Sequence, residues 1–390
     1  MKDFIFDVGT KILFGKDQLK NLPKEIKKYG DRVLLVYGGG SIKKIGLYNK
    51  VVELLNENDI FFKELAGVEP NPRVESAAEG VKIARENNLN FVLAVGGGST
   101  IDCSKLISAA FYEDCYPWDI VTRKVKPKKG LPIGTILTLA ATGSEMDRGS
   151  VITNQKTKQK LGWAANFTLP KFSILNPEFT YSVPKKHTAA GTADIMSHTM
   201  ENYFTLNDGA YLVDRFSEGL LKTCIKYGKI AYEKPDDYEA RANLMWANTW
   251  AINGLLDSGK DTEWSVHAME HELSAHNDLT HGWGLAILTP SWLRYCLSND
   301  TVDKICEFGQ NVFGLEIGED KFKTAEEAIK LLSEFFKSLD IPQSLKEVGF
   351  KEEDLPVMAE ACIKNHKGNI KGFVELDEAA VLEIYKMSYK

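Results

Sequence analysis

Two short apolar stretches in the first hundred residues end in the same tetrapeptide, Gly-Gly-Gly-Ser. Residues 32–37 (RVLLVY) lead into the first copy, and residues 91–95 (FVLAV) lead into the second. A short, β-branched apolar run that stops at glycines is typical of a strand buried on both faces. Helical spacing of apolar residues follows, so the pattern predicts parallel strands that alternate with helices.

The rest of the first half keeps this rhythm, and the second half does not. Strand-like runs recur at 60–65 and 132–139, and helical spacing recurs at 51–55, 74–87 and 100–111. From about residue 188 the pattern is helical without clear strands, at 189–204, 237–256, 262–276, 324–339 and 379–389. A proline and two lysines interrupt it at 184–186. We therefore predict an α/β domain with a parallel, Rossmann-like sheet over 1–185 and an all-α domain over 186–390.

Charge and apolar content exclude two classes of partner. The formal net charge is −6, whereas a nucleic-acid-binding protein usually presents a basic face. No apolar run approaches the ~20 residues that cross a bilayer, so we expect no membrane partner. The N-terminus lacks a signal-peptide pattern, and no two of the six cysteines stand at C-x-x-C spacing. Scattered cysteines suit a reducing compartment, which predicts a cytoplasmic protein.

The second glycine loop has the features of a phosphate site. Glycines allow a close approach of the backbone to a ligand, and the N–H groups at a helix start attract anions. Gly97, Gly98 and Ser99 would be the donors to a pyrophosphate. The loop does not follow the G-x-G-x-x-G fingerprint, and a tight strand-to-helix turn without a ligand is the alternative.

The first loop bears on the choice of cofactor. It consists of Gly38, Gly39, Gly40 and Ser41, and no acidic residue stands there to hold a ribose 2′-hydroxyl. Lys43 and Lys44 follow closely. Room for a 2′-phosphate favours NADP(H) over NAD(H), although lysines on a helix surface are also simply solvated.

A metal-binding pattern occupies the second half, where six of the seven histidines lie between residues 187 and 281. Asp194 and His198 are four residues apart in a helical segment, so their side chains share one face. His267 lies on a later predicted helix, and His281 follows fourteen residues on. Three imidazoles and a carboxylate form a donor set for Fe²⁺ or Zn²⁺, with a coordination position left for a substrate oxygen.

A rival motif overlaps this set. Residues 267–271 spell H-x-x-E-H, the inverted zinc-protease signature. In that hypothesis His267 and His271 bind zinc and Glu270 activates water. Five common residues recur by chance, and the hypothesis gives no role to the glycine loops or to Asp194.

Several long motifs follow one another along nearly the whole chain: YGGGS at 37–41, GVEPNP at 67–72, AVGGGSTIDCSK at 94–105, LAATGSEM at 139–146, GTADIMSHTMENYF at 191–204 and HAMEHELSAHNDLTHGWGLAI at 267–287. In these motifs and their order the chain resembles the iron-containing (group III) alcohol dehydrogenases, and in particular their bacterial NAD(P)H-dependent butanol dehydrogenase branch.

The resemblance implies an N-terminal dinucleotide-binding α/β domain, a C-terminal helical metal-binding and substrate domain, and an active site in the cleft between them. It implies Fe²⁺ as the favoured metal, with Zn²⁺ as the alternative, and a homodimer. The implied metal ligands are Asp194, His198, His267 and His281. The implied cofactor contacts are Gly97, Gly98, Ser99, Asp102, Thr138 and Thr142, with Lys160 near the nicotinamide ribose and Asn71 near the adenosine half.

The same resemblance places His271 near the nicotinamide and the substrate, which makes it the candidate catalytic residue and a proton relay. The predicted reaction is hydride transfer between NAD(P)H and a small aldehyde or primary alcohol. No arginine stands out near the metal motifs, which disfavours a hydroxy-acid substrate. A polyol dehydrogenase acting on glycerol or propanediol and a nucleotide-binding sensor without chemistry remain as alternatives.

Overall fold

The computed structural model describes residues 1–206 and 209–390, and these form two compact units. One unit, the sheet unit, comprises residues 7–183 and 235–249. The other, the helical unit, comprises residues 1–6, 184–234 and 250–390. This division differs from the predicted bounds of 1–185 and 186–390 chiefly at residues 1–6 and 235–249, and the bounds stay a prediction.

The sheet unit is built on six strands whose neighbours all run parallel, in the order β1-β8-β5-β4-β2-β3. The strands are β1 (Lys11–Phe14), β2 (Arg32–Tyr37), β3 (Phe61–Leu65), β4 (Phe91–Gly96), β5 (Ile133–Leu137) and β8 (Phe172–Leu175). A separate antiparallel hairpin consists of β6 (Gly149–Asn154) and β7 (Gln159–Ala164). The predicted parallel α/β sheet is therefore confirmed.

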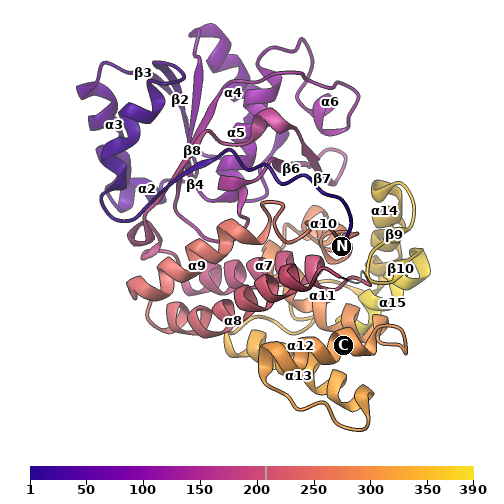
Figure 1. The fold of residues 1–390 in the computed structure, drawn as a ribbon. Helices are drawn as coiled ribbons and strands as arrows, with labels where there is room; N and C mark the ends of the chain where they lie inside the picture. Colours follow the sequence, from indigo (N-terminus) through magenta and orange to yellow (C-terminus); the bar gives the residue numbers. More distant parts are fainter. Residues whose placement is uncertain (207–208) are drawn as a thin grey trace. The chain divides into compact units, whose positions relative to one another are not determined.

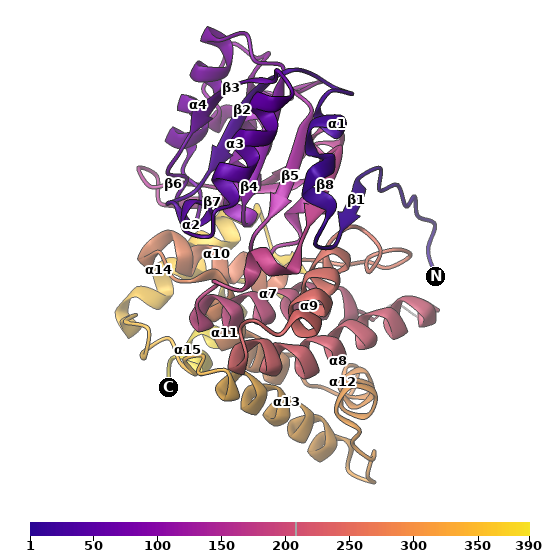
Figure 2. The same ribbon diagram turned by 90° about the vertical axis from the view of Figure 1, so that its left-hand side faces the viewer.

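Helices cover both faces of this sheet, and the strand sequences explain why. In β2, Val33 and Leu35 pack into one apolar core, whereas Leu34 and Val36 pack into another. Successive side chains of a strand point to opposite faces, so a strand that is apolar throughout needs a cover on each side. Figures 1 and 2 show α3 (Leu47–Glu57) on one face and α4 (Val74–Glu86) on the other. Beside α4, α5 (Gly98–Ala110) packs against the same core.

The helical unit is organised around α7 (Lys185–Tyr203), which packs against α8 (Tyr211–Glu233), α10 (Ser265–Asn277) and α11 (His281–Cys296). The contact between α11 and α7 is close because Gly282 has no side chain. A Cβ at Gly282 would stand 1.9 Å from the carbonyl oxygen of Ala190. The other helices of this unit are α12 (Val302–Phe308), α13 (Lys321–Ser338), α14 (Leu355–His366) and α15 (Glu378–Tyr389). Among the described helices, none is both long and apolar enough to cross a membrane.

Several elements of this part of the chain differ from the sequence prediction, which gives no helix at α12 or α14. The predicted pattern omits α8, although its buried residues Val213, Leu221 and Cys224 keep helical spacing. It also omits α11, where Pro290 lies inside the helix and interrupts the signal. Two strands of two residues each, β9 (Ile370–Lys371) and β10 (Glu375–Leu376), pair where no strand was expected. Runs this short carry no detectable alternation.

Candidate active site

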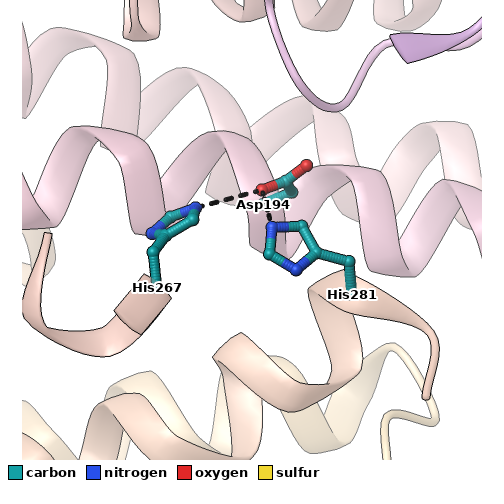
Figure 3. A group of neighbouring side chains, drawn as sticks. All are labelled: Asp194, His267 and His281. Atoms are coloured by element: carbon teal, nitrogen blue, oxygen red, sulfur yellow. Dashed lines mark ion pairs between the residues drawn. The ribbon is translucent and has the colours of Figure 1, made fainter. Parts of the chain in front are cut away.

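Three helices of the helical unit bring the predicted metal ligands together. Helix α7 carries Asp194 and His198 one turn apart, α10 carries His267 in its first turn, and His281 is the first residue of α11. Because α10 and α11 both pack on α7, the two later histidines approach Asp194 from separate helices. Figure 3 shows their rings converging on its carboxylate.

The distances at this cluster suit a single ion. The Nε2 atoms of His198, His267 and His281 lie 3.4, 3.8 and 3.7 Å from Oδ1 of Asp194. Ligands about 2.1 Å from a tetrahedral ion are separated by about 3.4 Å from one another. Donor atoms of Asp194, His267 and His281 all lie within 4.8 Å of each other. The group whose donor atoms all lie within 4.8 Å of one another does not include His198. The ring of His198 nevertheless stacks on that of His267, with 4.8 Å between the ring centroids.

Burial without hydrogen bonds gives a second reason to expect a cation here. Asp194, His198 and His267 are buried. Within the described parts of the chain, Oδ1 of Asp194 and Nε2 of His267 have no hydrogen-bond partner. A buried polar atom left unsatisfied costs free energy, so native proteins normally satisfy such atoms with protein groups, water or an ion. The donor set therefore fits a divalent transition metal.

The pKa values of Asp194, His198 and His267 depend on burial and on the charges of their neighbours. Burial opposes ionisation of Asp194, but the adjacent imidazoles of His198 and His281 outweigh it and hold its pKa below the usual value. Burial lowers the pKa of His198 to about 4, so this ring is neutral near pH 7. Burial also works against a charge on His267, yet the carboxylates of Glu201 and Asp194 raise its pKa to about 9. A cation at this point would take the place of that proton.

Two glutamates hydrogen-bond to the ligand imidazoles on the side away from Asp194, although the sequence analysis gave Glu201 no role and Glu270 only that of a protease base. Glu201 of α7 accepts from Nδ1 of His267, and Glu270 of α10 accepts from Nδ1 of His281. A carboxylate partner fixes the tautomer and orientation of a metal-bound imidazole. Residues 194, 198 and 201 share one helix face, so the spacing Asp-x₃-His-x₂-Glu was the available signal for Glu201.

Replacing Glu201 with glutamine is expected to weaken metal binding about 10- to 100-fold. Glu201 also accepts from the backbone N–H groups of Val266 and His267, each at 2.9 Å. An amide has one acceptor oxygen and cannot serve all three donors. Dialysis against graded chelator, followed by elemental analysis, measures the affinity. The control is Glu263→Gln, because Glu263 pairs with His366 at 3.3 Å outside the cluster. Equal metal retention by both variants would contradict this role.

The inverted zinc-protease hypothesis receives no support from this arrangement. Glu270 is fully buried, and its two carboxylate oxygens accept from the hydroxyl of Ser274 and the ring of His281. It is therefore not placed to activate a water molecule. His271 lies beside the cluster, with its ring centroid 6.3 Å from that of His267 and 5.9 Å from that of His281. Its proposed role as a proton relay stays a prediction.

The predicted phosphate loops lie next to each other in the sheet unit. β2 and β4 are adjacent, with Tyr37 opposite Val95, so both glycine loops leave the carboxyl edge of the sheet together. The chain runs from β2 outward to β3 and then returns to β4 on the other side of β2. In parallel sheets such a reversal point is the usual site of a dinucleotide.

Side chains from neighbouring segments close around the second loop. A Cβ at Gly98 would stand 2.1 Å from Oγ1 of Thr142, so only glycine fits there. Thr138 follows β5 directly, and its backbone N–H donates to the carbonyl of Gly96 at 3.0 Å. Gly97 and Ser99 are half-buried at the start of α5, whereas Gly39 and Ser41 of the first loop are exposed.

The remaining predicted cofactor residues are distributed around this edge. Asn71 has a left-handed backbone (φ 51°). The next residue, Pro72, accepts from the backbone N–H of Thr153, whose partner across the β6–β7 hairpin is the buried Lys160. Asp102 is buried, and its carboxylate accepts from Ser144 and from the backbone of Val151. Burial raises the pKa of Asp102 to about 6 despite the nearby positive charge.

Comparisons with known proteins agree along the whole chain. A model described as iron-containing alcohol dehydrogenase matches residues 9–177, and one described as the C-terminal part of the Fe-containing alcohol dehydrogenase family matches 188–389. NADH-dependent butanol dehydrogenases A and B of Clostridium acetobutylicum are 54% and 56% identical to the chain, over 100% of each protein. The crystal structure of NADH-dependent butanol dehydrogenase A from Thermotoga maritima is 36% identical, with a TM-score of 0.95, over 100% of this chain and 99% of that one.

Proposed function

Because this chain belongs to the iron-containing alcohol dehydrogenase family, we propose that it reduces short aldehydes with NADPH at a metal held by Asp194, His198, His267 and His281. Members of this family are oxidoreductases that interconvert alcohols and aldehydes with a nicotinamide cofactor and iron. The observation that carries the proposal is the approach of three Nε2 atoms to one buried carboxylate oxygen, at 3.4 to 3.8 Å.

The protein's own groups have distinct tasks in this proposal. A bound divalent ion would act as a Lewis acid toward the carbonyl oxygen, and the reduced nicotinamide would supply the hydride. Asp194 contributes the negative charge of the donor set. Glu201 and Glu270 keep the hydrogen of His267 and His281 on Nδ1, which directs Nε2 of each ring toward Asp194. His271 passes a proton to the product oxygen, since an imidazole titrates near neutral pH.

Cofactor binding is assigned to the glycine loops and the residues around them. Backbone N–H groups of Gly97, Gly98 and Ser99 hold the pyrophosphate at the start of α5. The first loop, Gly38 to Ser41, receives the adenosine ribose. The further contacts are Asn71, Asp102, Thr138, Thr142 and Lys160. These assignments are supported by the position of both loops at the reversal point of the sheet.

A preference for NADP(H) is proposed from the first loop, although the relatives named above carry NADH in their names. Gly39 offers no carboxylate to a ribose hydroxyl, and a Cβ there would meet no atom of the described residues within 4 Å. The acid on the adjacent strand, Glu64, already accepts from the hydroxyls of Tyr37 and Tyr48, at 2.5 and 2.6 Å. The loop therefore leaves room for a 2′-phosphate and presents no negative charge of its own against it.

Introducing a carboxylate by Gly39→Asp tests this preference. We expect kcat/KM with NADPH to fall about 100-fold, because juxtaposed like charges cost several kcal/mol, while kcat/KM with NADH changes little. Asn49→Asp adds the same charge to the exposed face of α3 and is the control. Steady-state kinetics with both cofactors measures the effect. A wild-type enzyme that already favours NADH would contradict the proposed preference.

The proposed reaction is tested with the purified protein loaded with Fe²⁺ without oxygen, or with Zn²⁺. We expect loss of the nicotinamide absorbance when NADPH and butyraldehyde are both present, and no loss without metal. A panel of short aldehydes, with 1,3-propanediol and glycerol in the reverse direction, ranks substrates by kcat/KM. Turnover of none of them with either cofactor would overturn the proposal, and a clear preference for the diols would favour the polyol activity.

Family membership also supports two further proposals, a homodimer and a cytoplasmic location. Sedimentation of the purified chain across a concentration series measures the first. A monomer at micromolar concentration would contradict it.

A further inference from the structure

Lys105 is a fully buried lysine that the proposed chemistry does not use. It lies in the middle of α5, and its side chain is 0% exposed. Lysine is almost never fully buried unless its charge is paired and hydrogen-bonded, because desolvation of an ammonium group is costly. The partners of Lys105 should therefore indicate what the residue does.

Among the described residues, the side-chain hydrogen-bond partners of Lys105 lie on the short segment from Ser144 to Gly149, the first residue of β6. Its Nζ donates to Oγ of Ser144 at 2.7 Å and to the carbonyl of Gly149 at 2.6 Å. The carboxylate of Asp147 stands 3.8 Å away. Ser144 also binds α5 at a second residue, because its hydroxyl donates to the carboxylate of Asp102 at 2.6 Å. Lys105 thus binds the segment 144–149 directly, and Asp102 of the same helix binds that segment at Ser144.

The segment held in this way carries proposed cofactor contacts at both ends. Upstream, Oγ1 of Thr142 accepts from the backbone N–H of Ser144 and lies against Gly98. Downstream, β6 begins at Gly149, and its hairpin partner β7 carries Lys160. Asp102 reinforces the downstream end, because it accepts from the backbone N–H of Val151 at 2.9 Å.

Helical spacing places these groups on one face of α5. Gly98, Asp102 and Lys105 are separated by four and three residues, so they lie in a row along the helix. The first touches Thr142, and the other two bind the segment that follows it. The face of α5 that starts at the phosphate turn is therefore the face on which the segment 142–151 docks.

We propose that Lys105 is a positioning residue for the nicotinamide dinucleotide, which holds the segment 142–151 in register with the phosphate turn at Gly98. The inference rests on the proposed function, because it concerns the cofactor assigned to this loop. Lys105 itself does not touch the dinucleotide. It acts by fixing Thr142 and the β6–β7 hairpin relative to the N-terminus of α5.

If Lys105 served only the stability of the fold, its loss would lower Tm without a specific effect on the Kd for the cofactor. A matched control variant on the same helix separates this structural role from the positioning role. Ser108 is buried on the same helix, and its hydroxyl donates to the carbonyl of Leu131 at 2.6 Å, away from the segment 142–151. Ser108→Ala therefore removes one buried hydrogen bond of α5 without touching the proposed network. Lys105→Met removes the ammonium group of the network, and Ser144→Ala removes the hydroxyl that bridges Lys105 and Asp102.

The experiment measures Kd for NADPH and for NADH by fluorescence titration, together with Tm, metal content and kcat at saturating cofactor. Lys105→Met is expected to raise Kd about tenfold with kcat within about twofold of wild type and with unchanged metal content, because only the cofactor contacts move. Ser144→Ala is expected to raise Kd as well, and the double variant to be no worse than Lys105→Met, because the two residues act as one unit. If Lys105→Met does not fold, Ser144→Ala alone decides the question.

Ser108→Ala should lower Tm and leave Kd at the wild-type value. If Lys105→Met and Ser144→Ala bind both cofactors like the wild type, the positioning role is overturned. A rise in Kd that simply follows the loss of Tm in all three variants, Ser108→Ala included, also overturns it. If the wild-type protein itself binds neither NADPH nor NADH, the proposed function fails first.

Discussion

Replacing His267 with alanine is expected to lower kcat/KM for aldehyde reduction about a thousandfold or more and to leave the protein without stoichiometric metal. The ring of His267 donates from Nδ1 to Glu201, and its Nε2 atom lies 3.8 Å from Oδ1 of Asp194. Loss of one of four donors removes the charge stabilisation that a Lewis acid would supply, which is worth several kcal/mol. A thousandfold change corresponds to about 4 kcal/mol. Metal analysis and steady-state kinetics on the same preparation measure both effects.

The control for His267→Ala is His366→Ala, which removes a histidine of the helical unit that also faces a carboxylate. His366 lies 3.3 Å from Glu263 and outside the ligand cluster. We expect its metal content and kinetics to match the wild type. Full metal content in the His267→Ala variant would contradict the proposed ligand set. Binding of NADPH should survive in the His267→Ala variant, because the proposed cofactor loops lie in the sheet unit.

Four of the six strands of the parallel sheet could be predicted, whereas β1 and the fully buried β8, which read KILF and FSIL, were not. β2 and β4 read as uninterrupted apolar runs that stop at glycines, and the predicted bounds of 32–37 match those of β2. The edge strand β1 reads KILF and is only partly buried, so its sequence carries a weaker signal. The strand order cannot be derived from such runs, because neighbouring parallel strands are distant in sequence and their pairing depends on crossovers.

The metal cluster was predictable in part. The spacing of Asp194 and His198 places both on one helix face, and this pairing is local. The approach of His281 depends on where α11 begins and on Gly282, which lets α11 come within contact of the α7 backbone. Neither feature is visible in an apolar pattern interrupted by a proline. Glu270 was considered only as a protease base, whereas its actual partners, Ser274 and His281, follow from tertiary packing.

The family and the activity were predicted from the resemblance of long motifs, because local residue patterns alone do not identify them. The family and the alcohol dehydrogenase activity predicted from the motifs are confirmed by the matches over 9–177 and 188–389. Lys160 and Asn71 stand in local sequence that carries no motif of its own, so only the resemblance to the family indicates a role for them. The roles of individual residues stay predictions.

Replacing Gly98 with alanine is expected to weaken NADPH and NADH binding about 100-fold or more while leaving the metal in place. The new Cβ would stand 2.1, 2.4 and 2.7 Å from three side-chain atoms of Thr142, including its own Cβ, so Thr142 must leave its position. Overpacking of this kind costs about 1–3 kcal/mol of stability. The loss of cofactor affinity is expected to exceed this loss of stability, because the phosphate turn at Gly98 and the side chain of Thr142 both move. Fluorescence titration of each cofactor measures Kd.

A Gly→Ala substitution at a position with free space is the control, because it removes a glycine without a steric clash. Gly219 is an exposed residue within α8, and a Cβ there would lie more than 4 Å from the other atoms that the structure describes outside the helix backbone and the residues next to it. Gly219→Ala should therefore raise Tm slightly, as alanine favours helix by about 1 kcal/mol, and leave Kd unchanged. Gly98→Ala would then lose cofactor but keep metal, whereas His267→Ala would lose metal but keep cofactor. If Gly98→Ala binds NADPH like the wild type, the loop that begins α5 is not the phosphate site.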